Sequence, residues 1–159
     1  MQEFLKVLEQ DGRCANSRIA RMLGITEEEV AARIADLEKK KVIVGYKTLI
    51  NWDRTDREVV DAFIELKVTP QPDAGFEDIA KKIKEFKEVE SVSLMSGGFD
   101  FAVTVKGANL RDVAMFVAEK LAPMEEVIST STSFVLKKYK QDGVIYYDDE
   151  KVMREVITL

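Results

Sequence analysis

The sequence predicts an α+β fold in which an N-terminal winged helix-turn-helix is followed by a ferredoxin-like βαββαβ plait. Two observations support this prediction. Three short amphipathic segments come first, and Gly24 stands between the second and third, where a helix-turn-helix needs a tight turn. Beyond residue 58 the spacing of apolar residues is typical of strands in some segments and of helices in others. These segments follow one another in the βαββαβ order of a plait.

The first two predicted helices are short. Phe4 belongs to an apolar stripe on the first helix, and Gly12 ends that helix. Asn16 or Ser17 can cap the second helix, because a side-chain oxygen at this position accepts from a free backbone N–H.

The third predicted helix opens with three glutamates at positions 27–29. Thr26 and Glu29 have the spacing of a capping box, and the helix dipole favours acidic residues in the first turn. The glutamates therefore have a structural role in starting the helix. Glu28 falls on the exposed face, where it can accept from a cytosine amino group or repel phosphates.

Two segments follow the helices. VIVGYKTLINW alternates around Gly45 and predicts a β-hairpin wing. Residues 1–50 are therefore expected to form the helix-turn-helix domain with its wing, and the polar residues 51–58 a linker.

Residues 59–139 are predicted to form the plait. Strands are expected at 59–68, 89–95, 99–106 and 127–139, and helices at 76–86 and 110–122. The sheet face turned away from the helices has small side chains and few charges. This favours packing on a second sheet, and hence a homodimer, over a plain solvated face.

Residues 140–159 form a C-terminal extension. Asp142-Gly143 predicts a tight turn that pairs VIYY with the preceding VLKKY. A short helix or an arm that reaches a partner is expected after it.

Composition excludes several classes of function. The chain has 159 residues and a net charge of −5, contains no histidine, and has Cys14 as its one cysteine. His-based acid/base catalysis, His-containing zinc sites and an intrachain disulfide are excluded. No carboxylate pair is placed for catalysis, so no catalytic residue, metal site or cofactor is expected. The apolar runs are too short to span a membrane and no signal peptide is evident, which predicts a cytoplasmic protein.

Charge is unevenly distributed along the chain. Residues 1–50 have nine basic and eight acidic residues, whereas residues 51–159 have 15 and 21. This balance argues against tight non-specific nucleic-acid binding by one copy and permits binding by a dimer or larger assembly. A helix-turn-helix used for protein contacts is the alternative.

The residues expected to contact double-stranded DNA lie on the second helix, the third helix and the wing. They are Ser17, Arg18, Thr26, Glu28, Ala32, Arg33, Lys39 and Lys47. Ala32 allows close approach of the third helix, and the basic residues, together with Arg21 on the second helix, can meet phosphates.

The run IARMLGITEEEVAARIADLEKKKVIVGY, the following Asn51, and SGGFDF between the central strands resemble the Lrp/AsnC family of feast/famine transcriptional regulators. The resemblance extends to about Tyr139. It implies a dimer built through the plait sheets, often assembled into tetramers or octamers. It also implies that the third helix enters the major groove at palindromic sites.

The resemblance further implies a small effector, commonly an amino acid, held between plait domains. The matching positions are Ser96, Gly97, Gly98, Phe99 and Asp100, with Thr130 and Thr132 facing from the last strand. Glycine would let backbone amides approach a ligand carboxylate, and Asp100 could accept from a ligand ammonium. For Gly97-Gly98 taken alone, an ordinary hairpin turn is the alternative.

The sequence departs from the family pattern in three ways. Lys41 stands where the family usually has glycine, the recognition helix is more acidic than usual, and the tail is longer. Because the recognition helix is acidic, the alternative remains that the protein is a ligand-binding oligomeric module with weak or lost DNA binding. Siroheme-decarboxylase-like enzymes resemble the same two-domain architecture, but histidines serve the tetrapyrrole there and this chain has none.

Overall fold

The computed structural model describes residues 1–70, 72 and 75–147. The chain divides into two compact units, Met1–Ile50 and Asn51–Leu159. Residues 148–159, the end of the predicted C-terminal extension, lie outside the described residues. Among the helices of the described ranges, none is long and apolar enough to cross a membrane.

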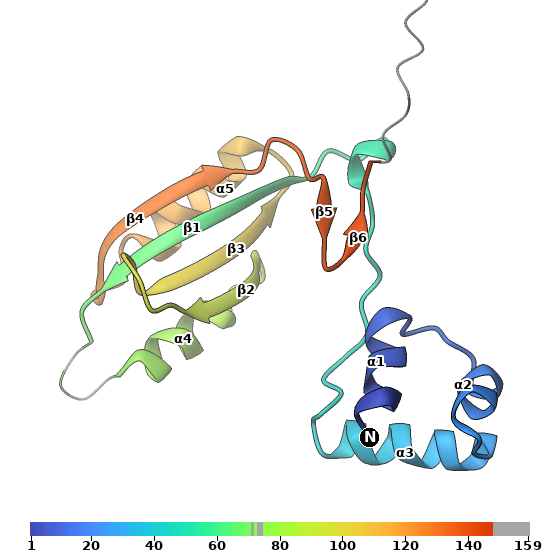
Figure 1. Ribbon diagram of the computed structural model, residues 1–159. Coiled ribbons are helices and arrows are strands. Elements are labelled where there is room, and N and C mark those ends of the chain that lie inside the picture. Colours follow the sequence, from blue (N-terminus) through green and yellow to red (C-terminus); the bar gives the residue numbers. More distant parts are fainter. Residues whose placement is uncertain (71, 73–74, 148–159) are drawn as a thin grey trace, which may run out of the picture. The chain divides into compact units, whose positions relative to one another are not determined.

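Three helices form the first unit (Figure 1): α1 (Gln2–Gln10), α2 (Asn16–Leu23) and α3 (Glu27–Lys39). Their shared apolar faces bury Phe4, Ile19, Ala20, Val30 and Leu37. The cap of α2 is Ala15, which has an extended backbone and no side-chain cap, so the prediction of Asn16 or Ser17 as the cap was wrong by one or two positions. Asn16 is instead the first residue of the helix itself.

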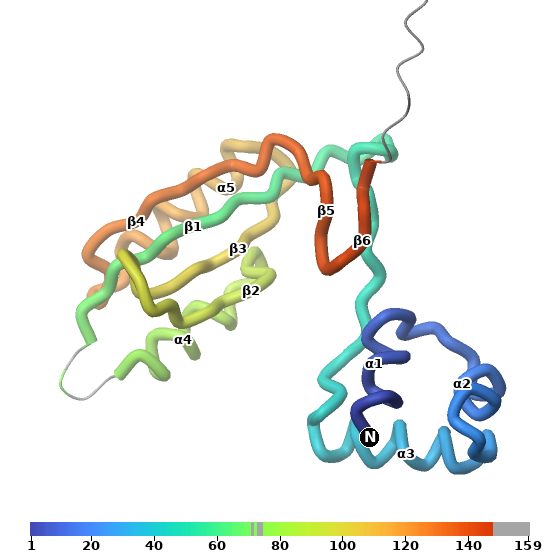
Figure 2. Tube along the Cα trace, in the orientation of Figure 1, coloured from blue at the N-terminus to red at the C-terminus, as the bar shows by residue number. Residues whose placement is uncertain are grey.

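The predicted wing is not formed. Residues 42–50 contain no strand, and the tube in Figure 2 follows them as an irregular segment. The amides of Val42 and Ile43 donate back to the Leu37 carbonyl at 2.9 and 3.2 Å. The Tyr46 hydroxyl donates to Glu38 Oε1 at 3.1 Å. An alternating pattern marks an extended segment but does not supply the second strand that a hairpin needs.

The second unit is the predicted plait. Its elements are β1 (Val60–Val68), α4 (Phe76–Lys84), β2 (Val89–Leu94), β3 (Phe101–Gly107), α5 (Leu110–Phe116) and β4 (Val127–Phe134). The four strands are antiparallel in the order β2-β3-β1-β4, and the helices cover one face (Figure 1). The α+β class and the plait order are therefore confirmed. The helix predicted to run to residue 122 changes after Phe116 into a π turn, Val117–Leu121.

The two faces of the sheet differ in chemistry. Ile64 and Leu66 of β1 and Val103 of β3 are fully buried against the helices. Phe63 and Glu65 point the opposite way, because side chains alternate along a strand. No helix of the described chain covers this second face, called the open face below.

Two ion pairs connect the helical segments of the plait to residues just before strands. Lys82 of α4 pairs with Glu126 before β4, and the Glu126 side chain is only 5% exposed. Lys120 in the π turn pairs with Glu88 before β2 at 2.6 Å. In both cases the hydrogen bond from lysine is the main cause that lowers the pKa of the glutamate below its ordinary value.

The last strand of the plait ends at Phe134, earlier than predicted, because the chain then turns toward a separate hairpin. β5 (Lys140–Gln141) pairs with β6 (Val144–Ile145). Asp142 and Gly143 both have positive φ, 48° and 81°, as a tight hairpin turn requires. The predicted turn is therefore present. The two strands pair at residues 140–141 and 144–145, and of the predicted partner segment 135–139 the Tyr139 carbonyl takes part, accepting from the Tyr146 N–H at 2.9 Å.

Candidate functional site

The turn between α2 and α3 has the geometry of a helix-turn-helix. Gly24 ends α2 in the left-handed conformation at φ 65° and donates its N–H to the Ala20 carbonyl. Thr26 begins α3: its N–H donates to Glu29 Oε2 at 2.9 Å, and its hydroxyl accepts from the Glu29 N–H at 3.1 Å. The predicted capping box is therefore present, and it occupies the side chains of Thr26 and Glu29.

The outward face of α3 is flat and mixed in charge. Glu28, Ala32, Ala35 and Lys39 are exposed on α3, and Val30 and Leu37 are buried on its other side. The two alanines leave this face free of long side chains at its centre. It can approach another surface closely, with an acidic residue at one end and a basic residue at the other.

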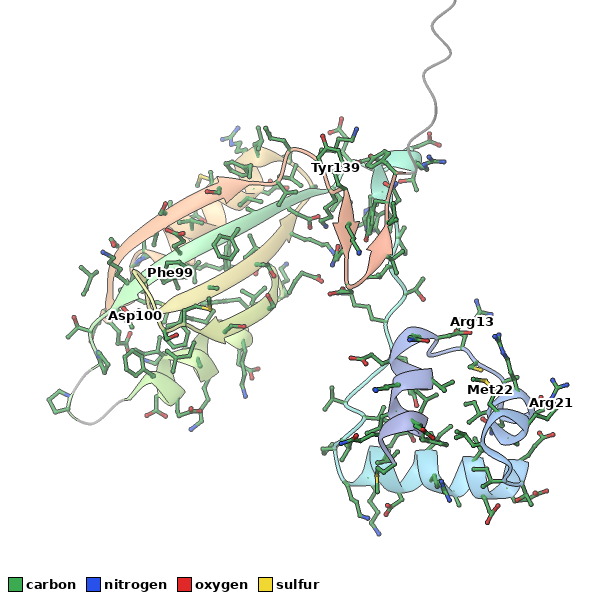
Figure 3. The ribbon with its side chains drawn as sticks, viewed as in Figure 1. Arg13, Arg21, Met22, Phe99, Asp100 and Tyr139 are labelled. Carbon is green, nitrogen blue, oxygen red and sulfur yellow. The ribbon has the colours of Figure 1, made fainter. Side chains whose placement is uncertain are left out.

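Positive charge gathers on α2 and the turn before it. Arg13, Arg18 and Arg21 are exposed, and the chain contains no acidic residue from Gly12 to Gly24. Figure 3 labels Arg13, Arg21 and the neighbouring Met22 in this region. Arg13 was absent from the predicted contacts, although the acid-free run in the sequence is a signal that points to it.

The remaining residues predicted to contact DNA lie in three different places on the first unit. Arg33 lies on the flank of α3 beside α1, where it lines an apolar hollow with Met1, Phe4 and Leu37. Ser17 is half-buried in the first turn of α2. Lys47 is exposed on the irregular segment that replaces the wing. The structure therefore brings Glu28, Ala32 and Lys39 together on one face and leaves Arg33 beside it.

The loop between β2 and β3 is tied to the end of β1 through Asp100. The carboxylate of Asp100 accepts from the Val68 N–H at 2.8 Å, and its own N–H donates to the Leu66 carbonyl at 2.8 Å. Asp100 was predicted to bind a ligand ammonium. Its Oδ2 accepts from the Val68 N–H, so Asp100 positions the loop. Its contact with a ligand ammonium stays a prediction.

A hollow of about 410 Å³ opens beside this loop on the open face of the sheet. It is lined by Glu65, Lys67, Gly98, Phe99, Ser129 and Ser131. Phe99 meets Phe63 edge-on at a centroid distance of 6.1 Å, and Figure 3 shows Phe99 and Asp100 at the same end of the sheet. The hollow combines a cation, an anion, two hydroxyls and an aromatic ring, which suits a small ligand with both charges.

Thr130 and Thr132 do not line this hollow. They pair with Leu66 and Ile64, whose side chains are buried under the helices, so both threonines face the helix side. Ser129 and Ser131 face the open side with Lys67 and Glu65. The predicted face was wrong because a strand of alternating serine and threonine contains no apolar period that fixes its orientation.

The glycines of the loop are not demanded by backbone geometry. Neither Gly97 nor Gly98 has a positive φ, and an added Cβ would meet nothing within 4 Å at either position. Both stand in open space beside the hollow together with exposed Ser96. Across residues 1–70, 72 and 75–147, no group of three or more acidic, cysteine or histidine side chains is arranged to hold a metal ion.

Comparison with known proteins matches both units. The AsnC-type helix-turn-helix domain matches residues 3–38, and the Lrp/AsnC ligand binding domain matches residues 61–145. The chain is 45% identical over 152 residues to the HTH-type transcriptional regulator YugG of Bacillus subtilis, covering 94% of this chain and 92% of that protein.

More distant relatives are similar over most of their length. The proline dehydrogenase transcriptional activator of Rhizobium radiobacter is 24% identical over 142 residues, covering 89% of this chain and 90% of the relative. The crystal structure of the transcriptional regulator NMB0573 of Neisseria meningitidis, a complex with L-Met, superposes with a TM-score of 0.70. That match has 24% identity and covers 87% of this chain and 88% of the other.

Proposed function

This chain belongs to the Lrp/AsnC family of helix-turn-helix transcriptional regulators, and we propose that it binds specific double-stranded DNA under the control of an amino acid. Residues 1–50 act as the DNA-binding domain, residues 51–58 link it to the plait, and residues 59–139 bind the effector and dimerise. The protein acts in the cytoplasm, where its DNA partner lies, and it is not an enzyme.

One observation supports DNA binding above the others. The exposed arginines of α2 and the alanine-centred face of α3 stand on the two sides of the Gly24 turn. In helix-turn-helix proteins the second helix of the motif enters the major groove and the first crosses the backbone. Arg18 and Arg21 would therefore meet phosphates, whereas Ala32 and Lys39 would approach bases.

The acidic first turn of α3 sets a limit on affinity. Glu28 would lie near the groove, where it accepts from cytosine and repels phosphates elsewhere. Binding by a dimer compensates, because two linked helix pairs add their contacts on two half-sites.

An amino acid suits the hollow beside the β2–β3 loop. Its carboxylate could pair with Lys67, its ammonium with Glu65, and its polar atoms with the hydroxyls of Ser129 and Ser131. The L-Met complex of the Neisseria regulator supports this class of ligand by similarity of fold. Lys67 and Glu65 replace Asp100 in this proposal, since Asp100 holds the backbone of Val68.

The open face of the sheet is the proposed dimer interface. It presents Phe63, Phe99 and Ala102 among serine and threonine side chains. A solvated face on a monomer would have more long charged side chains. Further assembly of dimers, as the family resemblance implies, would place effector hollows at the contacts between plaits.

A mobility-shift titration tests the function. The full chain is titrated on duplex DNA from the region upstream of its own gene, at low and moderate salt, with and without a mixture of amino acids. A specific shift that the mixture alters is expected. Absence of a shift at any salt would contradict the proposal and favour a ligand-binding oligomer whose acidic α3 no longer binds DNA.

A further inference from the structure

The C-terminal hairpin contacts the chain at the point where it enters the second unit. Asn51 Nδ2 donates to the Tyr146 carbonyl at 3.1 Å across a sequence separation of 95 residues. The Tyr147 hydroxyl donates to the carboxylate of Asp53. Figure 1 shows the short turn of Trp52–Arg54 beside the end of β6. The first and last described segments of the second unit are therefore joined to each other.

The hairpin is ordered by its own contacts. The Tyr146 N–H donates to the Tyr139 carbonyl at 2.9 Å, which extends the pairing of β5 and β6 by one step. The Tyr146 hydroxyl donates to Gln141 Oε1 at 3.2 Å. The side chains of Val144 and Ile145 remain 52% and 61% exposed. The hairpin thus adds no side chain to the core of the plait, and burial of apolar surface does not explain where it lies.

A second set of contacts ties the base of the hairpin to the sheet. The Val135 N–H donates to the Asp61 carbonyl at 2.9 Å, and Lys138 pairs with the Asp61 carboxylate. Lys137 Nζ lies 4.4 Å from the centroid of the Tyr147 ring and 5.1 Å from that of Tyr139. Contacts therefore run from Asp61, near the start of β1, through residues 135–138 to Tyr147.

The segment that Tyr147 holds is itself a compact turn. The Arg54 N–H donates to the Asn51 carbonyl at 3.2 Å and the Thr55 N–H to the Trp52 carbonyl at 2.9 Å. The Arg57 guanidinium lies 5.0 Å from the centroid of the Trp52 ring. Residues 51–57, named the connector turn here, are thus a structured element at the entrance of the plait.

We propose that the C-terminal hairpin is a clamp that holds the connector turn against the β1–β4 end of the sheet, with Tyr147 as its positioning residue. The clamp fixes the conformation of residues 51–57, the segment through which the chain enters the plait. Its regulatory consequence rests on the proposed function: a change in the sheet on effector binding would reach the connector turn from Asp61 through the adjacent Lys138 and Lys137 to Tyr147. The clamp itself does not depend on that function.

Trp52 provides a direct probe, because it is the chain's only tryptophan and lies in the connector turn. Tyr147→Phe removes the hydroxyl that bonds Asp53, whereas the matched control Tyr139→Phe removes a hydroxyl for which the described structure has no hydrogen bond. In the full chain, Tyr147→Phe is expected to lower the anisotropy of Trp52 fluorescence and to increase its quenching by acrylamide. Tyr139→Phe is expected to match wild type. Equal quenching in all three proteins would overturn the clamp.

A double-mutant cycle identifies the bond responsible. Asp53→Ala removes the acceptor, so it should change Trp52 quenching as Tyr147→Phe does, and the double variant should add little to either. Fully additive effects would show that the two side chains act separately and would overturn their pairing. A thermal unfolding curve equal to that of wild type confirms that the core of the plait is intact in each variant.

A second measurement separates the clamp from the proposed function. With the duplex from the upstream region as probe, Tyr147→Phe is expected to keep DNA binding and to reduce the shift in affinity that the amino-acid mixture produces. An unchanged shift, together with altered Trp52 quenching, would overturn the role in regulation. If wild type binds no DNA, the proposed function fails, and the Trp52 measurements still decide whether the clamp exists.

Discussion

Phe99 lies edge-on against Phe63, with ring centroids 6.1 Å apart and planes at 81°, on the face of the sheet that no helix covers. Aromatic pairs of this kind usually stabilise a core or an interface. On the proposal that this face forms a dimer interface, we expect Phe63→Glu to yield a monomer, because a charge opposite a second apolar face is costly to bury. Light scattering coupled to gel filtration measures the change.

Met115→Glu is the control for that substitution. Met115 is also partly exposed, but it lies on α5, on the helix side of the plait. It should leave the mass in solution unchanged. A dimer that tolerates Phe63→Glu would place the interface elsewhere.

Glu28→Lys tests whether α3 faces DNA. Replacing an acid by a base near the phosphates should tighten binding to all sequences and steepen the dependence of log K on log salt by about one unit. Fluorescence anisotropy of labelled duplex at several salt concentrations measures both quantities. Glu9→Lys makes the same charge change on α1 and should have a smaller effect. Equal effects of the two substitutions would mean that only net charge matters.

Lys41 occupies a position that favours glycine. Its φ is 58°, in the left-handed region that a side chain disfavours. Lys41→Gly should therefore raise the free energy of unfolding by ~1 kcal/mol. Urea unfolding followed by far-ultraviolet circular dichroism measures it. Lys40 has an ordinary φ of −78°, so Lys40→Gly should lower the same free energy, and a loss in both variants would rule out backbone strain at Lys41.

The Lys82–Glu126 ion pair should make the stability of the plait depend on pH. The hydrogen bond from Lys82 holds the pKa of Glu126 below its ordinary value of 4.5. A lowered pKa in the folded state stabilises the protein at pH above the ordinary pKa, and this stabilisation is lost as pH falls through the lowered pKa. The difference in unfolding free energy between wild type and Glu126→Gln should therefore be greatest near neutral pH and shrink in acid.

Glu125→Gln is the matched control for the pH experiment. Glu125 is exposed next to the buried Glu126 and acts on Lys82 only through its charge. Its substitution should change stability little at any pH. A constant difference between wild type and Glu126→Gln down to strongly acidic pH would contradict the assigned pair.

Gly98→Val tests the hollow beside the β2–β3 loop. The side chain meets nothing within 4 Å at its Cβ, so stability should be unchanged, but it would fill space between Phe99 and Ser131. The effect of the amino-acid mixture on DNA affinity should be lost while DNA binding in its absence remains. A full response in the variant would place the effector outside this hollow.

Local signals in the sequence predicted the structure well. The capping box of Thr26 and Glu29, the left-handed Gly24 and the Asp142-Gly143 turn each depend on a few adjacent residues. The spacing of apolar residues was sufficient to predict the order of strands and helices in the plait. Buried residues recur every second position in a strand and every three to four positions in a helix.

Features that depend on distant residues were missed or misplaced. A wing needs a pairing strand, and residues 42–50 have none among the residues that the structure describes. The side of β4 that faces the hollow depends on pairing with Lys67 and Glu65, which the sequence of β4 does not encode. The contacts of the hairpin with Asn51 and Asp53 join residues more than 90 positions apart. Patterns among neighbouring residues therefore could not predict them.

The serine–threonine alternation of β4 has a consequence for the register in which this strand pairs with β1. A slip of one residue would exchange serine and threonine at four of the five positions from 129 to 133, so both faces would keep hydroxyls there and differ only by methyl groups. The middle of this strand therefore does little to choose between two alignments. The choice rests on the strand's apolar ends, Val127 and Phe134, which pack against the core. Replacing Val127 or Phe134 by a small polar residue should leave β4 paired but allow it to interconvert between two registers, rather than unfold it.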